Sequence, residues 1–291
     1  MMNISQLLKE AESGFGAEGL PTPGLDAEVL LAFSIARERH FLYAHPAKEI
    51  SGVEMERFRS LVAKRIKGKP VAYITGRKEF WSLNFEVTPD VLIPRPDTEI
   101  LVEEILRLSG QEKEVKIRIL EIGTGSGAIS VALASELKNA SITATDFSPN
   151  ALAVAEKNAV NNKVGEKISF LCGDMFDPVE GKFDIIVSNP PYITEHEFEL
   201  LAPEVREYEP RRALVAGPEG TEFHRKLVRD GERFLENGGR LVMEMGADQR
   251  FAIEKMLKEK DYCDIVFHRD YAGLMRVAIA KELKINNLYT W

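Results

Sequence analysis

Residues 117–128 read Ile117-Arg118-Ile119-Leu120-Glu121-Ile122-Gly123-Thr124-Gly125-Ser126-Gly127-Ala128. Four of the six residues 117–122 are apolar, which predicts a strand, and Ala128 begins a helical pattern that continues to Glu136. The glycines between them permit a tight turn and let backbone N–H groups approach a ligand at the helix N-terminus. The spacing is Gly-x-Gly-x-Gly, whereas the fingerprint of dinucleotide-binding loops is Gly-x-Gly-x-x-Gly. The loop is therefore less suited to binding a pyrophosphate.

From residue 115 onward, strand and helix patterns alternate, which is typical of a doubly wound parallel sheet. The predicted strands are residues 117–122, 141–146, 168–172, 183–188, 239–243, 264–267 and 275–280. The predicted helices are residues 128–136, 150–161, 223–234 and 251–258. Because no helix is evident between the last two strands, we expect them to form an antiparallel pair at the edge. The fold class is therefore α/β, with a Rossmann-like, doubly wound sheet of seven strands.

The chain before this region carries different patterns. Residues 3 to about 68 show helical spacing and almost no strand signal, which predicts a small helical bundle. Within it, Ser51 and Glu54 predict a capping box. The period-two pattern over residues 80–87 predicts a short strand pair, with Trp81 on the same face as Phe85. We therefore expect a helical domain over 1–76, a β-hairpin connector over 77–96 and the sheet domain over 97–291.

Acidic residues follow the next two predicted strands. Asp146 ends the second strand, and a carboxylate at that place in a Rossmann-type fold can accept hydrogen bonds from both hydroxyls of a ribose. A helix N-cap or a turn is the structural alternative. After the third strand, Asp174 can bond an exocyclic amine and Met175 can pack on an adenine face. An N-cap aspartate and a core methionine are the alternatives for these two residues.

The fourth predicted strand runs into Asn189-Pro190-Pro191-Tyr192. Two prolines restrict φ and supply no N–H, so the carbonyls of Asn189 and Pro190 can point into a cavity. The Asn189 oxygen and a nearby carbonyl can accept both hydrogens of a substrate NH2 group, and the Tyr192 ring can stack on its planar π system. The alternative is a Pro-Pro turn that closes the strand. All four strand ends lie at the carboxyl edge of the sheet, where open α/β folds bind ligands.

Composition limits the class of protein. The chain has 291 residues, 44% of them hydrophobic, and a formal net charge of −8, which does not suggest a long electrostatic footprint for nucleic acid. Its two cysteines, Cys172 and Cys263, have no spacing that would complete a metal site, so we expect a reducing compartment and no metal. No run resembles a signal peptide or a membrane span. These features predict a soluble, cytoplasmic protein, and nothing in them requires an oligomer, so a monomer is expected.

The strand-end residues together resemble class I S-adenosylmethionine-dependent methyltransferases that modify planar nitrogen atoms, a group that includes DNA adenine, RNA guanine and protein glutamine methyltransferases. The resemblance implies S-adenosyl-L-methionine as cofactor and S-adenosyl-L-homocysteine as product. The implied cofactor-binding residues are Glu121, Gly123, Thr124, Gly125, Ser126, Gly127, Asp146, Asp174, Met175 and Asn189. The implied catalytic residues are Asn189, Pro190 and Tyr192, and with Pro191 they are also the implied substrate-binding residues.

Segments outside this core resemble one family in that group, the protein-(glutamine) methyltransferases that act on peptide chain release factors. These segments are residues 70–76, Phe80-Trp81, residues 93–99 and residues 209–214. The resemblance implies that the substrate is the glutamine of the release factor's Gly-Gly-Gln loop, methylated on its side-chain amide nitrogen. It also implies that the helical N-terminal domain docks the protein substrate, with no direct nucleic-acid substrate and no membrane.

Several further residues remain open between two interpretations. Arg95, Thr98 and Glu99 could close over the cofactor or substrate, or could be ordinary residues of a helix start. Glu121 is either a solvated strand-end acid or a group near the cofactor's positive charge, and Glu244 is another acid at a strand end. A basic cluster near the connector is either a docking surface or a solvated helix end; its members are Lys64, Arg65, Lys67 and Lys69. Neither His196 nor His224 has an acidic residue at a spacing that would indicate a catalytic pair, so both are predicted to lie at the surface.

Two other functions compete with this interpretation. A nucleic-acid amino-methyltransferase would use the same tetrapeptide on adenine or guanine, but it predicts a basic recognition surface that the −8 charge does not favour. A non-catalytic binding module would retain only a vestigial cofactor site. The presence of both Asp146 and the glycine loop argues against that second alternative.

Overall fold

The computed structural model describes residues 2–110 and 116–282. The chain divides into two compact units. The helical unit comprises residues 1–77 and 202–208, and the sheet unit comprises residues 78–201 and 209–291. Among the described residues, no helix is both long enough and apolar enough to span a bilayer.

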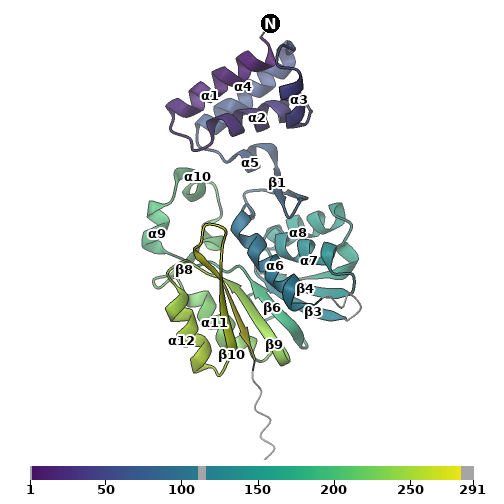
Figure 1. The fold of residues 1–291 in the computed structure, drawn as a ribbon, viewed down its shortest axis with the longest axis vertical. Helices are drawn as coiled ribbons and strands as arrows, with labels where there is room; N and C mark the ends of the chain where they lie inside the picture. The colour runs from purple at the N-terminus through teal and green to yellow at the C-terminus, as the bar shows by residue number, and fades with distance from the viewer. Residues whose placement is uncertain (1, 111–115, 283–291) are drawn as a thin grey trace, which may run out of the picture. The chain divides into compact units, whose positions relative to one another are not determined.

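Helices form the helical unit, as the sequence predicts. They are α1 (Ile4–Ala17), α2 (Pro23–Ser34), α3 (Arg39–Ala44), α4 (Gly52–Ile66), α5 (Val71–Thr75) and α10 (Pro203–Arg206). Figure 1 shows α1 to α4 packed side by side. Their core is built from fully buried side chains such as Phe15, Leu31 and Phe58. The capping box predicted at Ser51 and Glu54 is confirmed at the start of α4.

The short helix α10 joins this unit through a buried ion cluster. Arg65 of α4 donates to Asp26 of α2 at 2.7 Å and to Glu204 of α10 at 2.6 Å. Only 2% of Arg65 is exposed. Both interpretations of Arg65 in a basic surface cluster are therefore wrong, because its guanidinium is an internal group whose two partners come from distant parts of the sequence. Tyr208 adds a further tie, since its hydroxyl donates to the Lys67 carbonyl at 2.8 Å.

Replacing Arg65 with alanine is expected to lower the free energy of unfolding by about 3–5 kcal/mol, because Asp26 would keep a buried charge without its cation. Urea-induced unfolding followed by circular dichroism measures this change. The matched control is Arg59→Ala, which removes an ion pair to Glu10 whose side chains are both 52% exposed; it should cost about 0–1 kcal/mol. Equal losses for the two variants would contradict the structural role of Arg65.

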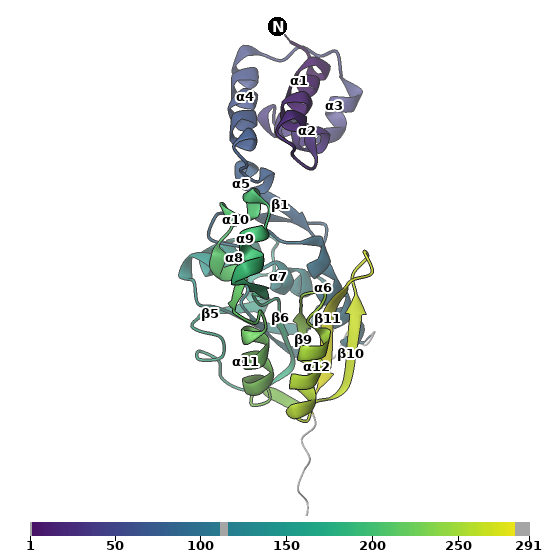
Figure 2. The same ribbon diagram turned by 90° about the vertical axis from the view of Figure 1, so that its left-hand side faces the viewer.

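The sheet unit holds a seven-stranded sheet with the order β10-β11-β9-β6-β3-β4-β5. The strands are β3 (Ile117–Ile122), β4 (Ala140–Asp146), β5 (Ile168–Cys172), β6 (Phe183–Ser188), β9 (Leu235–Glu244), β10 (Cys263–Arg269) and β11 (Met275–Lys281). The first five run parallel, and β11 is antiparallel to both β9 and β10. The predicted antiparallel pairing of the last two strands is confirmed, although only β10 is at the edge (Figure 2).

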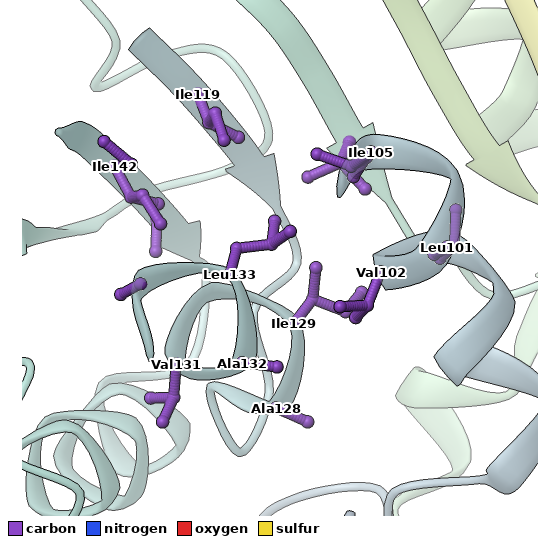
Figure 3. Close-up of a cluster of buried hydrophobic side chains, with 14 of the residues drawn as sticks. Leu101, Val102, Ile105, Ile119, Ala128, Ile129, Val131, Ala132, Leu133 and Ile142 are labelled. Carbon is purple, nitrogen blue, oxygen red and sulfur yellow. The ribbon is translucent and has the colours of Figure 1, made fainter. Parts of the chain in front are cut away.

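Helices cover both faces of this sheet. They are α6 (Glu99–Leu108), α7 (Ala128–Glu136), α8 (Pro149–Asn161), α11 (Glu222–Gly231) and α12 (Arg250–Glu259), with 3₁₀ turns η1 (Pro96–Thr98) and η2 (Gly165–Lys167). Because successive strand residues point to opposite faces, two separate cores form. Ile119 and Ile142 pack with α6 and α7 on one face (Figure 3). Leu120 packs with α11 and α12 on the other. The predicted seven-stranded α/β fold is confirmed.

The predicted strand pair is a two-stranded sheet of β1 (Arg77–Phe80) and β2 (Leu83–Glu86). The prediction that Trp81 lies within a strand is wrong. Trp81 and Ser82 have φ of 53° and 55° and form the turn between the strands. Positive φ at two successive residues is what a two-residue hairpin turn of type I′ needs. Such turns usually carry Asn or Gly, and neither residue is present at positions 81 and 82, so the turn was not predictable.

The segment between β6 and β9 contains elements that the sequence pattern did not predict. They are β7 (Ile193–Thr194), α9 (Glu195–Leu200), η3 (Arg211–Ala213) and β8 (Val215–Gly217), in addition to α10. β7 and β8 pair in parallel. The chain thus leaves the sheet unit after α9, contributes residues 202–208 to the helical unit, and returns immediately before Glu209.

Candidate active site

The candidate site lies where the sheet order reverses. β3 pairs with β4 on one side and with β6 on the other, so the loops that follow these strands diverge and leave a crevice at the carboxyl edge. A cavity of about 450 Å³ occupies this place, lined by residues of the sheet unit. The predicted site residues in its lining are Arg95, Thr98, Glu121, Gly123, Thr124, Gly125, Ser126, Asp146, Asp174, Met175, Asn189, Pro190 and Pro191. Glu99, Gly127 and Tyr192 do not line it.

The glycine loop joins β3 to α7 in a conformation that L-residues rarely adopt. Gly125 has φ of 54° and Gly127 has φ of 80°. Gly127 also lies against α8, where an added Cβ would be 3.1 Å from the Cβ of Ala155. The first glycines therefore shape the turn along the cavity, whereas Gly127 permits close packing behind it.

A buried amide on α8 supports this loop, and sequence reasoning did not single it out. Asn158 is fully buried, and its Nδ2 donates to the Ser126 carbonyl at 2.9 Å. The same side chain bonds both the N–H and the carbonyl of Glu86 on β2. Asn158 thus ties the glycine loop to the hairpin. Only the presence of an asparagine inside a helix hinted at it.

Asp146 ends β4 beside the glycine loop. Its Oδ2 accepts from the Gly125 N–H at 2.9 Å, and its Oδ1 accepts from the Ser148 N–H at 2.9 Å. The N-cap of α8 is Ser148, so the N-cap alternative for Asp146 is wrong. Burial raises the pKa of Asp146 above its ordinary value, although these backbone hydrogen bonds oppose the rise. The carboxylate is held rigidly at the cavity wall.

Asp174 and Met175 lie along the same wall, after β5. Asp174 is exposed. Met175 is half-buried and has φ of 47°, and its carbonyl accepts from the Thr145 hydroxyl at 3.2 Å. The left-handed backbone at Met175 turns the chain past the end of β4. The two residues are therefore brought to the same cavity as Asp146.

Glu121 lies at the end of β3 and is 1% exposed, so it is not a solvated acid. Its Oε2 accepts from the Thr124 hydroxyl at 2.7 Å and from the N–H of Ser130 at 3.2 Å, and it also accepts from the Ser130 hydroxyl. Burial raises the pKa of Glu121 to about 7, against the lowering effect of those bonds. Glu121 therefore faces the cavity while bracing the loop.

The raised pKa of Glu121 predicts a stability change with pH. Between its ordinary value of 4.5 and about 7, the folded state binds more proton at this site than the unfolded state, so rising pH destabilises the fold. Relative to the native protein, Glu121→Gln should gain about 1–3 kcal/mol in unfolding free energy between pH 5 and pH 8. Urea unfolding at both pH values measures this. A stability difference that stays constant with pH would contradict it.

The tetrapeptide Asn189–Tyr192 follows β6, and the side chains of Thr98 and Glu244 form hydrogen bonds with it. The Nδ2 of Asn189 donates to the Thr98 hydroxyl at 3.0 Å, and Thr98 in turn donates to Glu244 at 2.7 Å. The Tyr192 hydroxyl donates to the other oxygen of Glu244 at 3.2 Å. Burial raises the pKa of Glu244 to about 7. Burial and the nearby Glu244 charge raise the pKa of Tyr192, so its hydroxyl keeps its proton.

Two of the segments that carry the family resemblance meet at this site. Glu209 has a side chain only 1% exposed, accepts from the Ile93 N–H at 3.1 Å and pairs with Arg95. Arg95 is therefore fixed at the cavity by an acid 114 residues away. Glu99 points elsewhere, because its carboxylate accepts from the Trp81 N–H at 2.7 Å. Glu99 is thus not part of the cavity lining, and of its two interpretations this contact favours an ordinary residue of a helix start.

Other residues reach the cavity without having been predicted as site residues. Arg212 and Phe147 both line it, with the Arg212 guanidinium 5.5 Å from the centre of the Phe147 ring.

The two histidines predicted at the surface are His196 and His224. His196 is exposed as predicted, but His224 is fully buried and bonds the Glu244 carbonyl at 2.8 Å. Burial lowers the pKa of His224 to about 4, so it remains neutral.

Comparison with protein families gives two matches. The PrmC N-terminal domain matches residues 6–76, and the Methyltransferase small domain matches residues 96–205. The first match covers most of the helical unit. The second covers the glycine loop and Asn189–Tyr192.

Curated relatives match over nearly the whole chain. A release factor glutamine methyltransferase of Coxiella burnetii is 41% identical over 281 residues, covering 96% of this chain and 96% of the relative. Another, from Geobacter sulfurreducens, is 41% identical over 275 residues, covering 94% and 95%. Among solved structures, a methyltransferase from Pyrococcus furiosus aligns with a TM-score of 0.53 at 21% identity, over 76% of this chain and 98% of that one. This structural likeness confirms the fold.

Proposed function

The chain belongs to the family of release factor glutamine methyltransferases, and on this premise we propose that it transfers a methyl group from S-adenosyl-L-methionine to the side-chain amide nitrogen of the glutamine in the Gly-Gly-Gln loop of peptide chain release factors. It is accordingly a protein-(glutamine) N-methyltransferase. The observation that carries the proposal is the shared cavity, whose lining includes both the glycine loop and Asn189.

The cavity residues fit S-adenosylmethionine as cofactor. The glycine loop presents backbone at the N-terminus of α7, and the Asp146 carboxylate lies beside it to accept from ribose hydroxyls. Asp174 and Met175 line the adjoining wall, where an exocyclic amine and an adenine face would lie. Buried Glu121, in its ionised form, supplies negative charge suited to the cofactor's cationic end. When bound, the cofactor supplies an electrophilic methyl group and leaves as S-adenosyl-L-homocysteine.

The residues of the tetrapeptide have to compensate for the low nucleophilicity of the amide nitrogen. The lone pair of an amide nitrogen is delocalised into its carbonyl, so orientation is the main contribution that the protein can make. The Asn189 side-chain oxygen and the Pro190 carbonyl would accept hydrogen bonds from the two N–H groups of the glutamine amide. These hydrogen bonds strengthen as the nitrogen becomes positive, which stabilises the transition state. One proton then leaves the methylated nitrogen, to water or to a carbonyl.

Tyr192 has a different role in this proposal from the stacking role first considered. Its side chain does not line the cavity, and its hydroxyl bonds Glu244. We assign it to fixing the end of the tetrapeptide. Pro190 is buried and lines the cavity, which suits a carbonyl acceptor at a rigid position.

We propose that the helical unit docks the release factor. Lys64 and Lys67 are exposed on or just after α4 and offer a positive surface. The double change Lys64→Glu/Lys67→Glu should raise KM for a whole release factor several-fold and leave KM for a short Gly-Gly-Gln peptide unchanged. The matched control is Lys255→Glu/Lys258→Glu on α12. An unchanged KM for whole release factor would count against docking by this surface.

The competing substrate class is nucleic acid, which offers planar NH2 groups to the same tetrapeptide. Incubation with methyl-labelled S-adenosylmethionine and, separately, a release factor, tRNA or DNA distinguishes the two. We expect label in the release factor. Label in nucleic acid alone would contradict the proposed function.

A further inference from the structure

Glu244 lies beside the tetrapeptide but outside the cavity lining. β6 and β9 are parallel, with Ser188 opposite Met243, so the next residues, Asn189 and Glu244, are neighbours at the carboxyl edge. Glu244 is 1% exposed. One carboxylate oxygen accepts from the Thr98 hydroxyl at 2.7 Å and the other accepts from the Tyr192 hydroxyl at 3.2 Å.

The proton count decides which way the Asn189 amide points. The Thr98 hydroxyl has one hydrogen, and an ionised carboxylate can only accept, so Thr98 must donate to Glu244 whenever Glu244 is ionised. The Thr98 oxygen then has only lone pairs to offer to Asn189. The group of Asn189 that lies 3.0 Å from it must be the NH2 group. The carboxamide oxygen of Asn189 is thereby left for another donor.

We propose that Thr98 and Glu244 are positioning residues: through the chain Glu244–Thr98–Asn189 they make Asn189 present its oxygen, not its NH2 group, to the substrate amide. Glu244 also binds Tyr192, so it fixes both ends of the tetrapeptide at once. This inference rests on the proposed function, because it assumes that the substrate group is an amide NH2. If the Asn189 amide were turned over, two NH2 groups would face each other and no hydrogen bond could form.

The surroundings of Glu244 make this arrangement sensitive to pH. Asp97 and Thr98 face it from η1, Tyr192 from the tetrapeptide and Arg276 from β11, while His224 of α11 bonds its main-chain carbonyl. Burial raises the pKa of Glu244 to about 7. Once protonated, Glu244 can donate a hydrogen bond to Thr98. The Thr98 hydroxyl is then free to donate to Asn189, and the amide loses its fixed direction.

The test compares Thr98→Val, which keeps the shape and removes the hydroxyl, with Thr98→Ser, which keeps the hydroxyl. For Thr98→Val we expect kcat on release factor to fall about 10- to 100-fold. Its dissociation constant for S-adenosylhomocysteine should stay within about twofold, which shows that the fold and the cofactor cavity are intact. Thr98→Ser should recover kcat to within about threefold of the native value. Equal kcat in native protein and Thr98→Val, or an equal loss in both variants, would overturn the inference.

Two further readouts separate positioning from a merely structural role. In native protein, kcat should fall as the pH drops below about 7, and Glu244→Gln should flatten this dependence. The side-chain NH2 signals of Asn189 in an NMR spectrum should shift in Thr98→Val and return in Thr98→Ser. A pH profile unchanged by Glu244→Gln, or unshifted NH2 signals, would contradict the inference. Absence of activity in the native protein would instead count against the proposed function.

Discussion

Asn189→Ala is expected to lower kcat for methylation of a release factor by about 10²- to 10³-fold, the usual cost of removing one hydrogen bond that strengthens in the transition state. The dissociation constant of S-adenosylmethionine should change by no more than about threefold, because the glycine loop and Asp146 remain. The reason is geometric. Asn189 provides a side-chain oxygen at the cavity, and its hydrogen bond to Thr98 fixes the direction of that oxygen. Single-turnover kinetics with saturating cofactor, together with calorimetric titration of the cofactor, measure the two quantities.

The matched control is Asn161→Ala, the same substitution at an exposed position of α8. It should leave kcat within about twofold of the native value, as surface changes away from a site usually do. If Asn189→Ala also kept kcat near the native value, the tetrapeptide would be only a turn. A large loss of cofactor affinity with unchanged kcat would place Asn189 in cofactor binding alone.

Asp146→Ala is expected to weaken S-adenosylmethionine binding by about 10²-fold or more, since hydrogen bonds to a charged group are worth about 1.5–3 kcal/mol each. Two effects combine. The carboxylate would lose its bonds to ribose hydroxyls, and the N–H groups of Gly125 and Ser148 would lose their acceptor. At saturating cofactor, kcat should fall less than tenfold. Calorimetric titration with S-adenosylhomocysteine measures the affinity directly.

Asp177→Ala is the control for this change, because Asp177 is an exposed acid outside the cavity lining whose N–H bonds the carbonyl of Asp174. Its cofactor affinity should match that of the native protein. An Asp146→Ala variant that binds the cofactor normally would mean that the carboxylate only shapes the loop.

The sheet was predictable because local and tertiary signals agree there. Four of the six residues 117–122 are apolar, and they fall on both faces of the strand. The segment ends at a glycine loop and is followed by a helical pattern, and β3 has these bounds. Apolar residues on both faces are typical of a strand inside a parallel sheet. The strand-end residues could be grouped for the same reason, since carboxyl ends of parallel strands share one edge. The cavity lining does bring Asp146 and Asn189 together.

Other residues were not predictable because their partners lie elsewhere in the chain. Nothing near Arg65 indicates that Glu204, 139 residues later, will bond it inside the helical unit. His224 has an ordinary surface-helix context, but it is buried and bonds the Glu244 carbonyl at the end of β9. Glu99 follows Thr98 directly, yet the helix start turns one side chain to the cavity and the other to Trp81.

The positioning of Asn189 shows the same limit within the site. The sequence indicated an amide at the end of a strand, but not which end of the amide would face a ligand. That choice depends on which hydrogens Thr98 and Glu244 can donate. Thr98 lies 91 positions before Asn189, and Glu244 lies 55 positions after it. Such a chain becomes visible only when the strand order places β9 next to β6.

A mass spectrum of a release factor incubated with the protein and S-adenosylmethionine tests the proposed activity directly. We expect a gain equal to one methylene group in the peptide that contains the Gly-Gly-Gln loop, located by fragmentation on the glutamine side chain. We also expect Asn189→Ala to abolish this gain. A release factor without the gain, or with the gain on another residue, would contradict the proposed activity.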